Sequence, residues 1–154
     1  MVLGWRNHPE IRRYMFTQHE IQLEEHQQWF ARANLDPTRC LLLVEEATQP
    51  LGYVQFSHVA EHGVSDWGFY VRPNAPPGTG KKLGVMALNH AFEVLHLHKV
   101  CGQAIEANTR SIRFHERLGF TKEGELRDHQ CINGQYHTLI CYGLLAREWH
   151  PTRV

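Results

Sequence analysis

The stretch from Asn74 to Phe92, NAPPGTGKKLGVMALNHAF, joins a strand-like segment to a helix-like one through two closely spaced glycines. Gly78 and Gly80 allow the backbone to turn its N–H groups toward an anion, and the start of the next helix adds the positive end of its dipole. Such a turn can bind a pyrophosphate without a metal ion. A solvated connection between strand and helix can have the same glycine spacing, so this stretch alone leaves both interpretations open.

An ATP site is the first candidate, because Gly80 and Lys81 match the end of the phosphate-loop pattern Gly-x-x-x-x-Gly-Lys-Ser/Thr. That pattern needs a glycine at position 75 and a hydroxyl for magnesium at position 82, where this chain has Ala75 and Lys82. The later strand-like segment TLICYGLL, residues 138–145, contributes no acidic magnesium ligand. The sequence therefore favours a metal-free pyrophosphate site over an ATPase.

The length and charge of the chain exclude several classes of function. With 154 residues, 42% of them hydrophobic, we expect one domain spanning residues 1–154 around one core. Basic and acidic residues number 16 each, so no large positive field would attract nucleic acid or an anionic membrane. The sequence has no apolar run of about 18 residues and no secretion leader, and we expect a cytoplasmic protein.

Cysteine and histidine spacing gives no metal-site pattern. The four cysteines lack a Cys-x-x-Cys pair and are flanked by apolar strand-like runs, so we expect them to be structural free thiols. His129, Cys131 and His137 could face one another across a hairpin as metal ligands. No zinc-type spacing is met, and we therefore predict that the protein holds no metal.

Hydrophobic periodicity predicts an α+β domain with the element order ααβββαβαββ. Two helices come first, at Trp5–Tyr14 and Leu23–Ala33. Three strands of an antiparallel meander follow, at Cys40–Glu46, Leu51–Val59 and Val64–Arg72. After the glycine turn we expect a long helix, a strand at Lys99–Ile105, a helix from Asn108 to Gly119, and two strands around Asn133-Gly134.

Two neighbouring segments carry a family resemblance: GFYVRPNAPPGTGKKLG, residues 68–84, and AFEVLHLHKVCGQAIEANTRSIRFHERLGF, residues 91–120. In order and spacing they resemble the GNAT family of acetyl-CoA-dependent N-acetyltransferases, and the resemblance covers almost the whole chain. It implies an acetyl-CoA cofactor, no metal, and a single mixed, mostly antiparallel sheet with helices on both faces. Two parallel strands of this sheet splay apart at the acetyl-CoA site. The family normally has a first strand ahead of the position of MVLGW. Either the true start lies upstream, or this chain does without that edge strand, and an uncovered edge would favour a homodimer.

The resemblance assigns cofactor-binding residues to three places. The pyrophosphate of coenzyme A is held by backbone N–H groups of the glycine turn, from Gly78, Thr79, Gly80, Lys81, Lys82 and Leu83. The acyl-bearing arm pairs with the backbone from Phe69 to Val71, in a gap that a strand bulge at Gly68 would open; alternatively, Gly68 only makes room for Trp67 to pack. Asn108, which opens the later helix, is assigned to the cofactor as well. Ala75 departs from the family, which has Arg or Gln there, so side-chain help from that position is lost.

The family transfers the acetyl group directly, and this implies roles for two residues here. A neutral amine attacks the thioester, and the backbone N–H at or near Tyr70 meets the oxyanion. His115 stands where the family motif Asn-x-x-Ala-x-x-Leu-Tyr has its tyrosine, so it is the expected acid for the departing thiolate. A thiol with a pKa near about 8.5 can also leave unaided, in which case His115 merely packs. The base stays open among Asp66, His58, Glu106 and water.

The N-terminal segment WRNHPEIRRYMFTQHEIQLEEHQQWF, residues 5–30, supplies the expected acceptor wall. It resembles the subgroup that acetylates UDP-4-amino-4,6-dideoxy-N-acetyl-altrosamine in pseudaminic acid biosynthesis. Arginine suits a nucleotide diphosphate, while aromatic rings and methionine suit uracil and a deoxysugar. The expected substrate-binding residues are Arg6, His8, Tyr14, Met15, His26 and Trp29. Each of them could instead pack against the sheet.

Two other functions stay open at this point. A related acetyltransferase could act on a protein N-terminus or a ribosomal protein, although a polypeptide acceptor would need a long open groove. A GNAT-like domain could also bind an acyl-CoA or a partner without turnover. Release of free thiol during acetyl transfer separates this last function from both enzymes.

Overall fold

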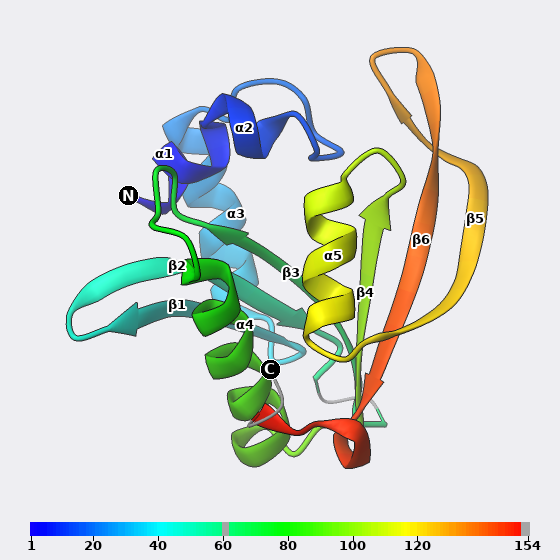
Figure 1. The fold of residues 1–154 in the computed structure, drawn as a ribbon. Helices are drawn as coiled ribbons and strands as arrows, with labels where there is room; N and C mark the ends of the chain where they lie inside the picture. Colours follow the sequence, from blue (N-terminus) through cyan, green and yellow to red (C-terminus); the bar gives the residue numbers. More distant parts are fainter. Residues whose placement is uncertain (60–61, 152–154) are drawn as a thin grey trace.

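Three strands rich in β-branched and aromatic residues form the first half of a six-stranded sheet (Figure 1). The computed structural model describes residues 1–59 and 62–151. The strands β1 (Arg39–Glu46), β2 (Gln49–Ser57) and β3 (Val64–Val71) pair antiparallel in chain order. The predicted meander is therefore confirmed, close to its predicted bounds.

Three later strands complete the sheet in the order β1-β2-β3-β4-β6-β5. β4 (Lys99–Ile105) pairs parallel with β3, whereas β6 (Gln135–Leu145) pairs antiparallel with both β4 and β5 (Thr121–Ile132). Asn133 and Gly134 have φ angles of 50° and 77°, as a two-residue hairpin turn requires. The single mixed, mostly antiparallel sheet is the predicted one.

The expected first helix is broken in two, as α1 (Val2–Asn7) and α2 (Pro9–Arg12). Pro9 is the physical reason, because a proline ring pushes the preceding residue out of the helical region, and His8 has an extended ψ of 133°. The Nδ1 atom of His8 accepts a hydrogen bond from the Glu10 N–H at 3.4 Å and so caps α2. The helix α3 (Leu23–Leu35) follows, where a second helix was expected.

Helices cover both faces of the sheet, as β2 demonstrates (Figure 1). A Cβ on Gly52 would lie less than 3.0 Å from Leu83 Cδ1, so Gly52 faces α4 (Thr79–Asn89) and allows its close approach. The next residue, Tyr53, contacts Trp29 of α3. Because successive strand residues point to opposite faces, α3 and α4 lie on opposite sides of the sheet.

The helix α5 (Thr109–Arg117) lies on the α4 side, where Phe114 stacks on Trp67 of β3 with ring centroids 6.0 Å apart. Trp67 is the register partner of Phe56 in β2, and Phe56 has the same orientation as Gly52. The glycine turn at the start of α4 and α5 therefore share one face of the sheet. The N-terminal segment, with its expected acceptor residues, occupies the other.

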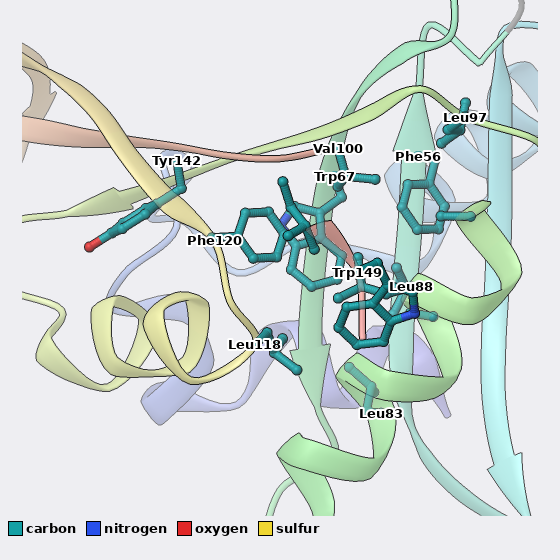
Figure 2. Close-up of a cluster of buried hydrophobic side chains, with 14 of the residues drawn as sticks. Phe56, Trp67, Leu83, Leu88, Leu97, Val100, Leu118, Phe120, Tyr142 and Trp149 are labelled. Carbon is teal, nitrogen blue, oxygen red and sulfur yellow. The ribbon is translucent and has the colours of Figure 1, made fainter. Parts of the chain in front are cut away.

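The C-terminal segment closes the core on the α4 side. The helix α4 continues as a five-residue π-helix, His90–Val94, and a short 3-10 helix, Ala146–Glu148, precedes Trp149. The indole N–H of Trp149 donates to Asn89 Oδ1 at 2.8 Å. Figure 2 draws Trp149 in the same buried cluster as Leu88 and Phe56.

Candidate active site

The strands β3 and β4 pair only at their N-terminal ends and then separate. Three residue pairs join them: Val64 with Lys99, Ser65 with Val100, and Asp66 with Cys101. Beyond this point both strands continue, to Val71 and Ile105, without pairing to each other. The predicted splay of two parallel strands is therefore confirmed.

Backbone groups of alternate β3 residues face this gap. Arg72 donates its N–H to the Leu51 carbonyl of β2 at 2.9 Å, which fixes the phase of the antiparallel ladder. Because the direction of the backbone groups alternates along a strand, those of Tyr70 are directed at β2. The other set faces β4 across the gap: Trp67, Phe69 and Val71. An extended ligand in the gap can bind their N–H and C=O groups.

The strand β3 departs from the sequence-based expectations at two residues. The predicted bulge at Gly68 is wrong, since the register of β2 and β3 runs without a shift along their whole pairing. Gly68 packs closely under Gln55, whose Nε2 would lie 3.3 Å from a Cβ at position 68. The phase of the ladder argues against the Tyr70 amide as oxyanion donor. It favours the neighbouring amides of Phe69 and Val71.

The glycine turn opens α4 beside the wide end of the gap. Gly78 is the N-cap with a φ of 90°, and no side chain caps the first turn of the helix. A Cβ on Gly80 would lie 3.6 Å from Val71 Cγ2 and 3.8 Å from Phe114 Cε2. The first turn of α4 therefore sits between the end of β3 and α5, where the N–H groups of Gly80 and Lys81, which have no intrahelical acceptor, can meet an anion.

Three side chains of this turn have partners within the protein. Thr79 donates its hydroxyl to the Pro76 carbonyl at 2.8 Å, and Lys82 forms an ion pair with Glu46 at 2.6 Å. Leu83 is fully buried in the core. The Thr79 and Lys82 N–H groups are engaged as well, because they donate to the Pro76 and Gly78 carbonyls at 3.2 Å each. Gly80 and Lys81 come before the first intrahelical hydrogen bond, so their N–H groups are the ones that this turn offers to a ligand.

Two further predicted cofactor residues are Lys81 and Asn108. Lys81 is exposed on the first turn of α4. Asn108 caps α5, because its Oδ1 accepts a hydrogen bond from the Ser111 N–H at 3.1 Å, and this confirms the predicted N-cap. Cofactor contacts of both residues stay predictions.

His115 is enclosed in the core, with 1% of its surface exposed. Its Nε2 accepts the indole N–H of Trp67 at 3.1 Å. Its Nδ1 lies 2.8 Å from the Ser111 carbonyl and carries the proton, because a carbonyl can only accept. Burial lowers the pKa of His115 to about 4. A neutral ring whose one proton is held by Ser111 has none for a thiolate, and this geometry argues against the predicted acid role.

The three candidate bases lie in different places. Asp66 is exposed and ends the paired part of β3, and alternation puts its side chain on the same face as that of Tyr70. Glu106 follows β4, and its Oε1 accepts the Thr138 N–H at 3.4 Å. His58 is exposed after β2. Of the three, Asp66 lies at the start of the gap.

Arg6 lies on the α3 side of the sheet, within electrostatic range of Tyr70. Its Nη2 donates to the Thr17 carbonyl at 3.2 Å, whereas its Nη1 is buried and has no hydrogen-bond partner among the described residues. Burial lowers the pKa of Arg6. Leaving such a donor unsatisfied costs about 1–3 kcal/mol, and a ligand oxygen at this point would remove that cost.

A row of aromatic rings leads from Tyr70 to a cavity beneath α3. The ring centroids of Tyr70 and Tyr53 are 5.2 Å apart, those of Tyr53 and Trp29 6.4 Å, and those of Trp29 and His26 5.6 Å. The cavity has a volume of about 370 Å³. Its mostly apolar lining includes His26, Trp29, Phe30, Leu41, Leu43 and Tyr53.

Three of the predicted acceptor residues have other surroundings. His8 caps α2, and the Arg13 guanidinium lies 4.4 Å over the ring of Tyr14. The carbonyl of Met15 accepts a hydrogen bond from the side chain of Gln18. Like Arg6, these three residues are not part of the cavity lining, and their acceptor role stays a prediction.

Sequence reasoning missed Tyr53 and Gln55 of β2. Tyr53 is buried, and its hydroxyl donates to Gln55 Oε1 at 3.2 Å. Burial also raises the pKa of the Tyr53 hydroxyl. The segment LGYVQF carried the signal, because Tyr53 and Gln55 are two residues apart and therefore share a strand face.

The structure shows neither a metal site nor a membrane helix in its described ranges. Across residues 1–59 and 62–151, no three His, Cys, Asp or Glu side chains are placed to hold a metal ion. In the β5–β6 ladder His137 pairs with Gln130 and Tyr136 with Cys131, so Cys131 and His137 project to opposite faces. None of the helices in these ranges is long and apolar enough to cross a bilayer.

Known proteins share the combination of two splayed parallel strands with a glycine turn at the start of the adjoining helix. The sequence model of the protein family described as acetyltransferase (GNAT) domain matches residues 1–121 of this chain. This chain belongs to the GNAT acetyltransferase family. Acetyltransferase PseH of Campylobacter jejuni is 27% identical to this GNAT protein over 134 residues, which are 86% of this chain and 83% of PseH. The putative ribosomal N-acetyltransferase YdaF of Bacillus subtilis is 44% identical over 62 residues, or 40% of this chain and 34% of YdaF.

A solved structure supports the same fold. Spermidine N-acetyltransferase from Vibrio cholerae, crystallised with CoA and spermine, superposes on this GNAT protein with a TM-score of 0.86 at 23% identity. The match covers 96% of this chain and 89% of that one. The chain is thus an N-acetyltransferase with the GNAT fold, and GNAT acetyltransferases use acetyl-CoA.

Proposed function

We propose that this enzyme acetylates the amine of a nucleotide-linked amino sugar, specifically the 4-amino group of a UDP-linked amino-dideoxy sugar of the pseudaminic acid pathway. The observation that carries the proposal is Arg6, whose buried Nη1 has no partner among the described residues. A diphosphate supplies oxygen acceptors suited to a guanidinium. The mostly apolar cavity beneath α3 suits a flat base or a deoxysugar.

Acetyl-CoA supplies the acetyl group as a thioester and leaves as a thiol. The residues present fit this cofactor. The turn at Gly78 and Gly80 offers backbone N–H groups without a capping side chain, and these would hold the pyrophosphate. The backbone of Phe69 and Val71, which faces the gap, would hold the acyl-bearing arm.

The gap opens to both faces of the sheet. In this proposal β3 contributes backbone N–H groups inside the gap and the Asp66 side chain on the α3 side. The N–H of Phe69 or Val71 stabilises the charge that develops on the carbonyl oxygen of the thioester. Asp66, at the start of the gap on the α3 side, accepts the amine proton through water in this proposal, because it lies three residues along the strand from Phe69. Tyr70 and Arg6 line the approach of the acceptor on that side.

A polyamine is the competing small-molecule acceptor, because the structural neighbour from Vibrio cholerae is named for spermidine. A polyamine site would need carboxylates turned toward the gap. Asp66 is the one carboxylate that the proposal places at the gap, as the base. In the N-terminal segment Glu25 pairs with His19 at 3.1 Å on the surface and lies within electrostatic range of Arg6, and Glu20 and Glu24 are exposed. The partly buried cation of Arg6 would also repel a polyamine, so we favour the nucleotide sugar.

A side-by-side acceptor assay tests the proposal. Purified protein and acetyl-CoA are offered the UDP-linked 4-amino sugar, the free amino sugar, spermidine and a ribosomal N-terminal peptide, with free thiol release as the readout. We expect the highest kcat/KM for the UDP-linked sugar. Preference for spermidine or the peptide would contradict the nucleotide-sugar proposal and leave the acetyltransferase assignment intact. Absence of thiol release with every acceptor would favour a non-catalytic acyl-CoA-binding domain.

The variant Arg6→Ala tests whether the Arg6 guanidinium binds the diphosphate of the acceptor. We expect the KM for the UDP-linked sugar to rise about tenfold or more, since a charge-assisted hydrogen bond contributes about 1.5–3 kcal/mol. The affinity for acetyl-CoA should not change. Arg32→Ala is the matched control, because Arg32 is an exposed arginine of α3. An unchanged KM in Arg6→Ala would remove the phosphate contact from the proposal.

A further inference from the structure

We propose that the hydrogen bond from Trp67 to His115, which passes over Gly102, is a wedge that holds β3 and β4 apart and sets the width of the cofactor gap. His115 is then a positioning residue at the place where the family motif has its tyrosine. The inference rests on the gap as the acetyl-CoA site and is independent of the acceptor's identity.

The position of the wedge is the first argument. Asp66 and Cys101 form the last parallel pair between β3 and β4. Trp67 and Gly102 are the next residue of each strand, so they stand at the point of separation. The indole N–H of Trp67 reaches His115 Nε2 on α5 at 3.1 Å, which ties β3 to α5 at this point.

Gly102 shows how closely the wedge fits against β4. A Cβ at position 102 would lie less than 3.0 Å from both His115 Nε2 and Trp67 Nε1. Both side chains therefore lie directly on the β4 backbone. Every residue other than glycine has a Cβ, and at this position it would have to displace the hydrogen-bonded pair.

The imidazole of His115 is fixed from several sides. The Ser111 carbonyl lies 2.8 Å from its Nδ1, so the tautomer that accepts the indole proton at Nε2 is the one present. The ring of Tyr142 on β6 lies parallel to it, with an interplanar angle of 5° and centroids 5.0 Å apart. Phe120 meets it edge-on at 5.0 Å. Figure 2 shows Phe120 beside Trp67 in the same cluster.

The wedge is coupled to the backbone that a cofactor would bind. Phe69, whose amide faces the gap, is two residues beyond Trp67, and the two rings are 4.9 Å apart. Phe69 also packs on Phe114 of α5, with centroids 4.5 Å apart. A shift of Trp67 therefore moves the Phe69 amide relative to the first turn of α4, which Phe114 adjoins at Gly80.

Calorimetric titration of acetyl-CoA into Trp67→Phe and His115→Phe tests the wedge. Each variant removes one partner of the bond and keeps an aromatic ring. We expect the Kd to rise roughly tenfold in each, and the double variant to be no weaker than the worse single one, because both changes delete one interaction. Additive losses in the double variant, or a parental Kd in Trp67→Phe, would overturn the inference.

The variant Trp149→Phe is the matched control. It also removes a tryptophan N–H bond, here to Asn89 at 2.8 Å, but the bond lies away from the gap. We expect its Kd for acetyl-CoA to stay within about twofold of the parent. A loss equal to that of Trp67→Phe would mean that general destabilisation, not gap width, governs affinity. If the unaltered protein binds no acetyl-CoA, the proposed cofactor site fails instead.

The variant His115→Tyr separates the wedge from the acid role. An acid at this position would be restored by tyrosine, with a kcat near the parent's. A wedge is not restored, because tyrosine has no acceptor at the position of Nε2 and its hydroxyl oxygen, which can accept, lies farther from the backbone. Acetyl-CoA affinity should therefore fall roughly tenfold as in His115→Phe. A His115→Tyr enzyme with parental kcat and Kd would therefore overturn the inference.

Hydrogen exchange in the unaltered protein provides a readout if the variants do not fold. Because cofactor binding and wedge formation favour each other, bound coenzyme A should slow exchange of the Trp67 indole N–H roughly tenfold. The Trp149 indole should change by less than about twofold. Equal changes at both indoles, or none at Trp67, would overturn the wedge.

Discussion

At the scale of single residues, His115 is the position where chemistry and packing give opposite expectations. A histidine with its ordinary pKa of about 6.5 suits proton transfer at neutral pH. Burial instead lowers the pKa of His115 to about 4, and the hydrogen bond to the Ser111 carbonyl, which acts in the opposite direction, does not offset it. The same side chain therefore couples folding to pH.

The pH dependence of stability follows from the direction of this shift. Between pH 6.5 and 4 the unfolded chain binds a proton at His115 and the folded one does not, so the free energy of unfolding falls as the pH falls. The stabilisation is complete above pH 6.5, and we expect about 2 kcal/mol to be lost by pH 5. Urea denaturation at pH 7 and pH 5 measures this difference.

His115→Gln provides the comparison for this measurement. Burial lowers the pKa of His26 as well, so His26 contributes a slope of the same sign in both proteins. The difference between the parent and His115→Gln isolates position 115. Equal pH slopes in the two proteins would mean that His115 titrates normally in the folded state.

At the scale of elements, hydrophobic periodicity and turn residues were enough to predict the strands of the sheet and the main helices from the sequence. The Asn133-Gly134 hairpin and the Asn108 cap are local signals, and both were confirmed. The break at His8 is local too, because Pro9 causes it, yet the helical pattern on either side concealed it. Local sequence therefore predicts elements well and their interruptions less well.

The site was less predictable, because it depends on contacts between distant elements. Nothing near His115 in the sequence indicates that Trp67 binds its Nε2 or that Gly102 makes room for both. The gap-facing amides depend on the phase that the Arg72–Leu51 hydrogen bond sets, which no local pattern records. The apolar runs beside Cys131 likewise do not show that this thiol is exposed in the β5–β6 hairpin.

The first turn of α4 allows a test at this scale. Gly80→Val adds a branched side chain. Its Cβ would make only contacts of ordinary van der Waals distance with Val71 and Phe114, so the fold should persist. Its methyl groups would keep a pyrophosphate away from the backbone, and we expect acetyl-CoA affinity to fall more than tenfold, about 1.4 kcal/mol or more. Calorimetry measures this loss.

Gly124→Val in β5 is the control for Gly80→Val, since a Cβ there meets nothing within 4 Å. Its affinity for acetyl-CoA should equal the parent's. Titration with Mg-ATP completes the comparison, and we expect no binding. Micromolar Mg-ATP binding with none for acetyl-CoA would contradict the family's use of this turn.

At the scale of the whole molecule, the sheet separates two approaches to one gap. The glycine turn and α5 lie on the α4 side, whereas Tyr70, Tyr53 and Trp29 lie on the α3 side. Cofactor and acceptor can therefore be present together. This arrangement favours direct transfer within a ternary complex over a two-step route through an acetylated enzyme.

Cys101 is the residue through which a two-step route would have to pass, because it ends the paired part of β4 at the start of the gap. Desolvation raises the pKa of its thiol, and a thiol without a lowered pKa is a poor nucleophile. We therefore expect Cys101→Ser to keep the parental kcat within about twofold, because in direct transfer the Cys101 thiol makes no interaction in the transition state. Initial rates with both substrates varied should give intersecting double-reciprocal lines, and the protein mass should be unchanged after incubation with acetyl-CoA alone. Parallel lines, together with an added acetyl group that is absent in Cys101→Ser, would contradict direct transfer. They would show that acetyl-CoA and the acceptor bind one after the other, with an acetylated Cys101 between the two steps.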